Sequence, residues 1–149
     1  MVHVLFLDVE SALRPWSYVR SRGSAISKTE VDPKCKNRLN CLLEEVPNLK
    51  IVLISEFRIG KSLREIKDLF SEHYRISEHI IDSTPVLKNN NHFEEVRYWI
   101  RASKLKIKKI AIIHHDPTGS EPEEDDFFEI DSEQGFSEHL YKSVLNHYI

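Results

Sequence analysis

Short apolar segments alternate along the chain with longer segments whose apolar residues recur at helical spacing. The short segments are rich in Val, Ile, Leu and Phe, and near-continuous runs of this kind are typical of strands buried on both faces of a parallel sheet. Five segments have this character, at residues 2–7, 50–55, 79–81, 109–113 and 127–130.

Helical spacing predicts four helices, at about residues 33–46, 60–70, 92–103 and 136–148. Asp32-Pro33 indicates an N-cap followed by a proline at the first helical position. Residues 9–31 form a long connection without a clear period. The alternation predicts an α/β fold, in which helices cover both faces of a mainly parallel sheet of about five strands in a three-layer, Rossmann-like arrangement.

The composition is that of an ordinary globular chain. With 149 residues, 40% of them hydrophobic and 30% charged, the chain is expected to form a single domain over residues 1–149. The formal net charge of −3 argues against a general nucleic-acid or membrane binder, although a local basic surface is compatible with it. No apolar run approaches the roughly 20 residues that cross a bilayer. The first strand begins without a charged leader, so we expect a cytoplasmic protein.

The two cysteines do not change this picture. Cys35 and Cys41 lie six residues apart in a predicted helix, which is not a zinc or redox spacing. We interpret both as reduced packing residues.

Polar residues follow three of the predicted strands, where each strand ends. Asp8 and Glu10 follow the first strand, Ser55 ends the second, and His114-His115-Asp116 follow the fourth. The carboxyl ends of parallel strands meet at one edge of a sheet, which is where open α/β folds bind ligands. A carboxylate that attacks phosphorus, an acid that protonates the leaving oxygen and a hydroxyl that holds phosphoryl oxygens suit phosphoryl transfer. The alternative is that these are solvated strand ends.

At these positions the chain resembles haloacid-dehalogenase-like phosphohydrolases. Leu-Asp-Val-Glu-Ser-Ala-Leu-Arg-Pro (7–15) is similar to their Asp-x-Asp-Gly-x-Leu signature, and Ile-Val-Leu-Ile-Ser-Glu-Phe-Arg (51–58) to their second motif. Ala-Ile-Ile-His-His-Asp (111–116) lies where the family has its acidic fourth motif.

Two further segments resemble a small, cap-poor branch of that family. Thr84-Pro85 with the following helix is similar to its third-motif region, and Asp-Ser-Glu-Gln-Gly-Phe (131–136) to a late segment. Members of this branch occur alone and within multidomain RNA-repair proteins. The resemblance spans nearly the whole chain, with no motif intact.

The resemblance implies roles for individual residues. Asp8 would accept the phosphoryl group and bind a metal, Glu10 would act as acid and base, and Ser55 would bind the transferred phosphoryl. The basic group of the third motif would be Lys88 or His92, and the sequence does not decide between them. Arg14 and Arg58 are the candidate substrate-binding cations, although for Arg58 a plain surface position is an equal alternative.

A divalent ion, Mg²⁺ or another such as Mn²⁺, is the implied cofactor, with Asp8, Glu10, Asp116 and His115 as candidate ligands. Imidazole is a poor magnesium ligand and suits manganese, iron or zinc, so the histidines indicate either a changed metal preference or a decayed site. Because neighbouring residues of an extended chain point to opposite faces, we expect at most one of His114 and His115 to bind an ion.

The remaining motifs are weaker. Gly60-Lys61-Ser62 resembles the end of a phosphate-binding loop, but the loop's first glycine would fall on Ser55, so a helix start is favoured. The segment 14–28 carries Arg14, Arg20, Arg22 and Lys28 without an acid, and also Trp16 and Tyr18. It is either a solvated loop or a basic surface suited to stacking a nucleobase beside a phosphate.

Together these features predict a metal-dependent phosphatase that acts through an aspartyl-phosphate at Asp8. The expected partner is a phosphorylated small molecule or macromolecule that reaches an uncapped site; no membrane is expected, and the oligomeric state stays open. Two alternatives remain: a binding module that keeps the fold without turnover, including a protein-interaction factor, and a factor that binds or processes nucleic-acid ends.

Overall fold

The computed structural model describes residues 1–88, 91–117 and 125–149. Within these ranges lie five strands, seven α-helices and two short 3-10 helices. In chain order they are β1 (Val2–Leu7), α1 (Val9–Leu13), α2 (Trp16–Arg22), η1 (Gly23–Ala25), α3 (Pro33–Glu45), β2 (Leu49–Leu53), η2 (Glu56–Arg58), α4 (Leu63–Leu69), α5 (Tyr74–His79), β3 (Ile80–Ser83), α6 (His92–Ala102), β4 (Ile107–His114), β5 (Phe127–Glu129) and α7 (Glu138–Tyr148).

All five strands form one parallel sheet in the order β3-β2-β1-β4-β5. β1 is the central strand, and the side chains of Val4 to Leu7 are completely buried. Strands enclosed on both faces have no need of alternating polar residues, which explains the near-continuous apolar runs. The predicted α/β fold with a parallel five-stranded sheet is confirmed.

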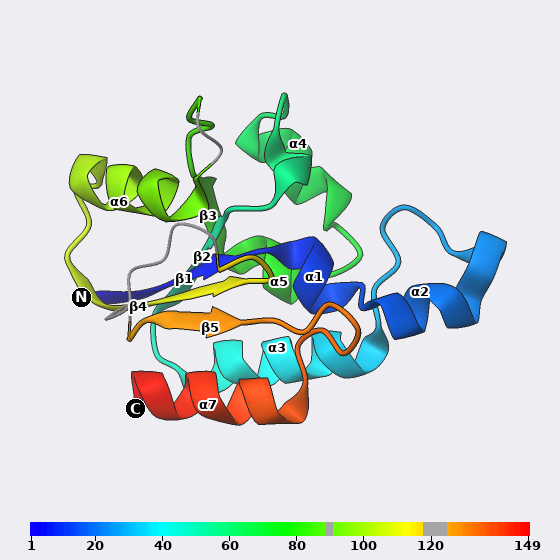
Figure 1. Cartoon of the computed structure of the whole chain (residues 1–149). Helices are drawn as coiled ribbons and strands as arrows, with labels where there is room; N and C mark the ends of the chain where they lie inside the picture. The colour runs from blue at the N-terminus through cyan, green and yellow to red at the C-terminus, as the bar shows by residue number, and fades with distance from the viewer. Residues whose placement is uncertain (89–90, 118–124) are drawn as a thin grey trace.

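Successive strand residues enter two hydrophobic clusters, one on each face of the sheet. Leu5 and Leu7 pack in a cluster with α3 and α7, whereas Val4 and Phe6 pack in a second cluster with α6. Figure 1 shows α3 and α7 on one side of the sheet and α6 on the other. Burying one such side chain contributes about 1.5–3 kcal/mol, so alternate residues of β1 attach both helical layers to the same strand.

The register of the sheet brings three strand ends together. Leu7 pairs with Leu53 of β2 and with Ile113 of β4. The residues that follow these strands therefore emerge at the same edge. The arrangement gathers Asp8, Ser55 and Asp116 at one rim, as the strand-tip argument predicted.

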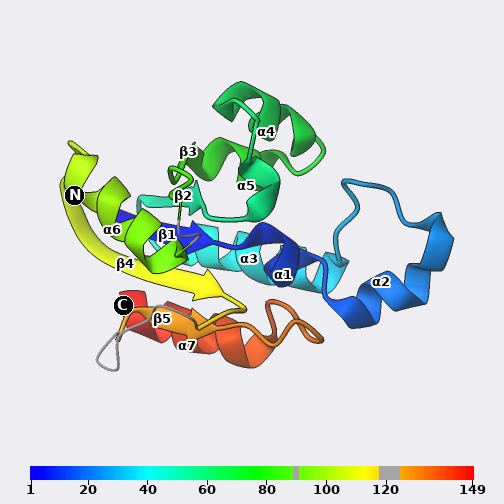
Figure 2. The same cartoon turned by 45° about the horizontal axis from the view of Figure 1, so that its top comes forward.

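The connection over residues 9–31 is more regular than its sequence indicated. It contains α1, α2 and η1, and α2 extends away from the sheet as an arm (Figure 2). α2 has no buried residue, so no apolar stripe marks it in the sequence. The backbone N–H of Trp16 donates to the carbonyl of Ser132, and Arg14 holds the returning loop. Contacts distant in sequence, which no local period reports, keep this segment in place.

Three smaller expectations also change. α5 (Tyr74–His79) was not predicted, because only Ile76 in it is buried. α4 begins after Ser62, which forms a capping box with Glu65. Of the two cysteines, Cys35 is buried as expected, but Cys41 is exposed, because it lies on the outer side of α3. Among the described residues, no helix combines the length and apolar character needed to cross a membrane.

Candidate active site

Asp8 stands at the carboxyl end of the central strand. Its backbone N–H donates to the carbonyl of Ile113, and the residue is only 4% exposed. One carboxylate oxygen, Oδ2, is closely surrounded: Oγ of Ser11 donates to it at 2.8 Å, Nδ1 of His115 lies at 2.8 Å and Nε2 of His114 at 3.6 Å. The other carboxylate oxygen, Oδ1, accepts no hydrogen bond from a described residue. The two oxygens of Asp8 therefore have different surroundings.

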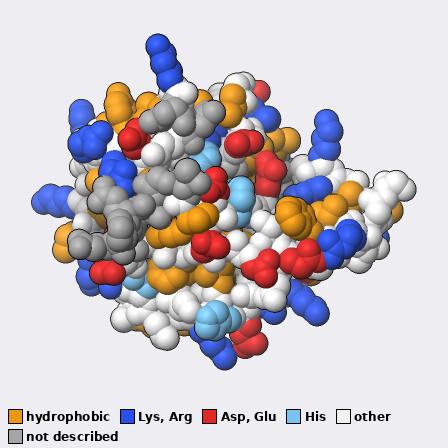
Figure 3. Space-filling model, in the orientation of Figure 1, with side chains coloured by type: hydrophobic (Ala, Val, Ile, Leu, Met, Phe, Trp, Pro, Cys, Tyr) orange, Lys and Arg blue, Asp and Glu red, His pale blue; other side chains and the backbone are white. Residues whose placement is uncertain are grey.

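A small cavity of about 120 Å³ opens beside Asp8. Its walls come from the ends of β1 and β4 and from α1, η2 and the start of α6. The lining residues are Asp8, Glu10, Ser11, Glu56, His92, His114, His115 and Asp116. Figure 3 shows histidine and acidic side chains gathered near the middle of the same face. The described lining residues include four acids and no Lys or Arg, so a bound anion would need a cation to offset the repulsion.

The two adjacent histidines both face Asp8, which corrects the expectation that they point to opposite faces. β4 ends at His114 and the chain bends at His115. The alternation of an extended chain therefore no longer applies. The rings are stacked, with centroids 4.5 Å apart and an interplanar angle of 22°. His114, which we had not chosen as a candidate ligand, is thus part of the cluster.

The backbone of Asp116 contacts Nδ1 of His114 through both its N–H and its carbonyl oxygen. Its N–H donates to Nδ1 of His114 at 2.9 Å, and its carbonyl oxygen lies 3.3 Å from the same nitrogen. Burial lowers the pKa of His114 to about 4, more than the nearby Asp8 carboxylate raises it. At neutral pH the ring is uncharged, and the shorter contact places its proton on Nε2, which faces Asp8.

The donor set fits a divalent transition-metal ion. One ligand atom each from Asp8, His114 and His115 lies within 4.8 Å of the others, a spacing that one ion can bridge. Binding at Nε2 of His114 requires the other tautomer, and the carbonyl of Asp116 is in position to accept the Nδ1 proton. One carboxylate with two imidazoles suits Mn²⁺, Fe²⁺ or Zn²⁺ better than Mg²⁺. Glu10 and Asp116 line the cavity but are outside this set of three.

Glu10 lies in the first turn of α1 and borders the cavity. Partial burial raises the pKa of its carboxyl group, and the negative charges of Asp8 and Glu56 raise it further, whereas Arg14 and Lys61 act in the opposite direction. Glu56 was not anticipated as a site residue. Its position directly after Ser55, at the tip of β2, is the signal that could have identified it.

Ser55 lies next to Asp8 but braces the backbone instead of facing the cavity. It is 1% exposed, its Oγ accepts a 2.6 Å hydrogen bond from the N–H of Val9, and the same Oγ lies 3.5 Å from the carbonyl of Leu7. Both neighbours of Asp8 are thus held by one hydroxyl. Both contacts of the Ser55 hydroxyl described here are with backbone atoms beside Asp8.

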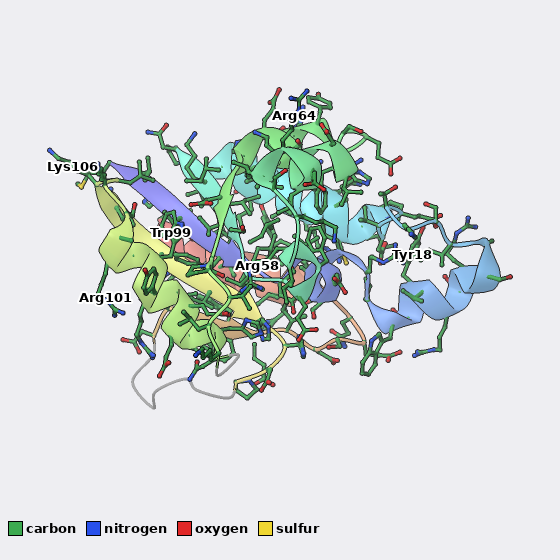
Figure 4. The ribbon with its side chains drawn as sticks, turned by 90° about the horizontal axis from the view of Figure 1, so that it is seen from above. Tyr18, Arg58, Arg64, Trp99, Arg101 and Lys106 are labelled. Atoms are coloured by element: carbon green, nitrogen blue, oxygen red, sulfur yellow. The ribbon has the colours of Figure 1, made fainter. Side chains whose placement is uncertain are left out.

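Arg58 is neither a surface cation nor part of the cavity wall. Its guanidinium is buried and donates to the carbonyls of Ile54, Ser55, Thr84 and Pro85. Nη2 also pairs with Oε1 of Glu95 at 3.1 Å. Figure 4 shows Arg58 in the interior of the ribbon. Because its donors are taken, Arg58 organises the loops behind the site, which corrects our expectation of a substrate clamp.

Of the two candidates for the basic group, His92 lines the cavity and Lys88 does not. Lys88 is exposed in the turn before α6. Nδ1 of His92 lies 3.0 Å from Oε1 of Glu95, and its ring centroid is 4.3 Å from that of His114. Glu95, which sequence reasoning did not single out as a site residue, therefore contacts both Arg58 and His92.

Three of the arginine side chains in the basic segment 14–28 have partners within the protein. Nη1 of Arg14 donates to the carbonyls of residues 27, 28 and 30, Arg20 pairs with Glu133, and Arg22 pairs with Glu30. The hydroxyl of Tyr18 also donates to Glu30. These acids lie outside residues 14–28, so the segment is less electropositive than its own sequence indicated.

A comparison with known protein families adds to this geometry. The chain matches the family described as the HAD domain in Swiss Army Knife RNA repair proteins over residues 4–140. No curated protein and no solved structure matches it. The match runs from within β1 to the first turn of α7 and includes every described residue of the cavity lining. The chain therefore belongs to the HAD domain family of Swiss Army Knife RNA repair proteins.

Proposed function

We propose that this domain is a phosphohydrolase that removes a phosphoryl group through an aspartyl-phosphate at Asp8. One observation carries the proposal: the buried carboxylate at the tip of the central strand presents one oxygen to two histidines and leaves the other without a described hydrogen bond. This division suits a residue that holds a cation with one oxygen and attacks phosphorus with the other.

In the proposed reaction Oδ1 of Asp8 forms a bond to phosphorus as the bond from phosphorus to the leaving oxygen breaks. Glu10 gives its proton to that oxygen. The Glu10 carboxylate then takes a proton from water, whose oxygen attacks phosphorus, and phosphate leaves as Asp8 is regenerated. His92 lies where it can hold a phosphoryl oxygen, and Ser55 keeps the Asp8 backbone in position.

Asp8, His114 and His115 are the residues that would hold a divalent ion, and the ion would supply positive charge to the phosphoryl oxygens. Two imidazoles in the set favour Mn²⁺, Fe²⁺ or Zn²⁺ over Mg²⁺.

The test is hydrolysis of an aryl phosphate with Mg²⁺, Mn²⁺ and Zn²⁺ in separate assays. We expect turnover with at least one ion, and a loss of at least about a hundredfold in kcat for Asp8→Asn. Asp68→Asn, an exposed acid on α4 outside the cavity, is the matched control. Activity that survives Asp8→Asn would exclude the mechanism.

A second candidate is a binding module without turnover, and one observation favours it. Oδ2 of Asp8 already has protein partners, because Oγ of Ser11 donates to it and Nδ1 of His115 lies 2.8 Å away. Beryllium fluoride with a divalent ion distinguishes the two, because the complex mimics a phosphorylated aspartate. A rise in melting temperature that disappears in Asp8→Asn supports the phosphohydrolase; no rise with any ion supports the binding module.

A further inference from the structure

A second, larger cavity of about 440 Å³ lies next to the candidate active site. It is bounded by α1, by the loop that leads into α3, and by the segment from η2 to the end of α4. The residues that line it are Val9, Glu10, Arg14, Lys28, Thr29, Val31, Phe57, Lys61, Leu69 and Phe70. Its volume is in the range of small-molecule sites, and nothing in the proposed reaction accounts for it.

The wall of this cavity is apolar and partly aromatic. Val9, Val31 and Phe70 are buried, and the Phe57 and Phe70 rings meet edge to face with centroids 5.8 Å apart. Leu69 is 37% exposed and completes the wall. Such a surface suits a planar, apolar group better than a sugar or a short aliphatic chain.

Cations stand at the rim of the same cavity. Lys28 and Lys61 are exposed, and no described residue forms an ion pair with either amino group. Nζ of Lys61 donates to the carbonyl of Phe57 and lies 5.6 Å from the centre of its ring, which leaves its other protons for a ligand. Among its described lining residues the neighbouring active-site cavity has no Lys or Arg, so an anionic group at Lys28 and Lys61 would be separate from one beside Asp8.

Glu10 belongs to the walls of both cavities. A phosphoryl group beside Asp8 would have its leaving oxygen near Glu10, and the rest of the leaving group would extend past Glu10 into the larger cavity. In a bound phosphoric ester, the phosphoryl group would lie in the smaller cavity and the leaving group in the larger one, with the bond to be broken near Glu10.

We propose that the larger cavity receives the leaving group and selects a nucleotide, with its base against Phe57 and Leu69 and a second phosphate at Lys28 and Lys61. This inference rests on the proposed phosphohydrolase function. The second phosphate is required because a nucleoside alone is uncharged and would leave the lysines without a partner. A free nucleoside bisphosphate and the phosphorylated end of an oligonucleotide share this chemistry.

The test compares kcat/KM for four substrates: acetyl phosphate, glycerol 3-phosphate, adenosine 3′,5′-bisphosphate and a short phosphorylated oligonucleotide. We expect the adenosine compound to exceed glycerol 3-phosphate by at least about tenfold. In Lys28→Gln/Lys61→Gln the ratio of adenosine bisphosphate to acetyl phosphate should fall about tenfold, mainly through KM. Lys106→Gln, at the opposite end of the molecule from α2 in Figure 4, is the matched control and leaves the ratio unchanged.

The outcomes separate the two proposals. Turnover of acetyl phosphate without preference for the adenosine compound, or an unchanged ratio in the double variant, overturns the leaving-group site and leaves the phosphohydrolase intact. A higher kcat/KM for the oligonucleotide than for the free bisphosphate assigns the site to nucleic-acid ends, and the reverse assigns it to free nucleotides.

If no substrate is turned over, the phosphohydrolase proposal fails, and binding of adenosine 3′,5′-bisphosphate still tests the cavity by calorimetry. Binding that weakens about tenfold in the double variant supports the nucleotide site. No binding, or equal binding in both proteins, overturns it.

Discussion

At the scale of single residues, the site is built on charged groups buried behind the cavity. Glu95 is 1% exposed and lies between Arg58 and His92. One carboxylate therefore positions both the arginine that holds the loops and the histidine that lines the cavity. Burial lowers the pKa of Arg58, although Glu95 counters part of that effect. A buried charge without its partner is costly, so the arrangement depends on each member of the group.

Glu95→Gln is therefore expected to destabilise the protein by about 3 kcal/mol, because Arg58 stays charged and buried without its carboxylate. Urea-induced unfolding at pH 7 measures the change. Glu44→Gln removes the acid of an exposed pair with Arg75 and should cost less than about 1 kcal/mol. Equal losses in the two variants would contradict a special role for the buried pair.

The thiols should react very differently. Burial, with the negative charge of Asp32 added, raises the pKa of Cys35 to about 11, whereas Cys41 is exposed. A thiol reagent at pH 8 should label one equivalent rapidly and the second only after unfolding, since the thiolate is the reactive form. Labelling of Cys35 should increase as the pH approaches 11.

The control for this prediction is Cys41→Ser, which should not be labelled rapidly in the folded state at pH 8. Rapid labelling of that variant would contradict the prediction, because it would show that the reagent reaches Cys35 on the buried side of α3.

At the scale of elements, contacts of the connecting segments position the helices that carry site residues. Gly135 adopts φ +68°, and its chain neighbour Phe136 donates a 2.8 Å hydrogen bond to the carbonyl of Ala12 in α1. A Cβ at position 135 would lie 2.8 Å from that same oxygen. The segment before α7 thus fixes α1, which carries Glu10, and only glycine permits the approach.

Gly135→Ala should therefore destabilise the protein by about 1–3 kcal/mol more than Gly60→Ala. Gly60 also has a positive φ, +77°, but an added Cβ there meets no atom within 4 Å, so it controls for backbone strain alone. Thermal unfolding of both variants measures the difference. Similar melting temperatures would mean that the contact with Ala12 relaxes easily.

At the scale of the whole molecule, one sheet joins two cores. Trp99 belongs to the cluster beneath α6, packs edge to face with Phe6 at 5.5 Å, and donates from Nε1 to Asp82. The helices α3 and α7 pack on the other face. Since β1 contributes to both cores, neither face can lose its packing without disturbing the other.

Unfolding is therefore expected to be a single cooperative transition, which would also support the prediction of a single domain over residues 1–149. In Trp16→Phe, which removes a 61% exposed side chain, fluorescence reports Trp99 alone and far-ultraviolet circular dichroism reports the helices. The two curves should coincide in urea. Separate midpoints would show that the α6 face and the α3–α7 face unfold independently.

The parallel sheet, the helices with apolar stripes and the rim that gathers Asp8, Ser55 and Asp116 could be predicted from the amino-acid sequence, because they follow from periodicity and from strands ending at one edge. Which polar groups face the cavity could be seen only in the folded protein. Arg58 turns inward because the carbonyls of Thr84 and Pro85 accept its protons, and Ser55 turns inward toward the carbonyl of Leu7 in β1. His115 lies where the chain bends after β4, and its Nδ1 contacts the Asp8 carboxylate. These orientations depend on contacts between segments far apart in the chain, and local sequence patterns carry no record of such contacts.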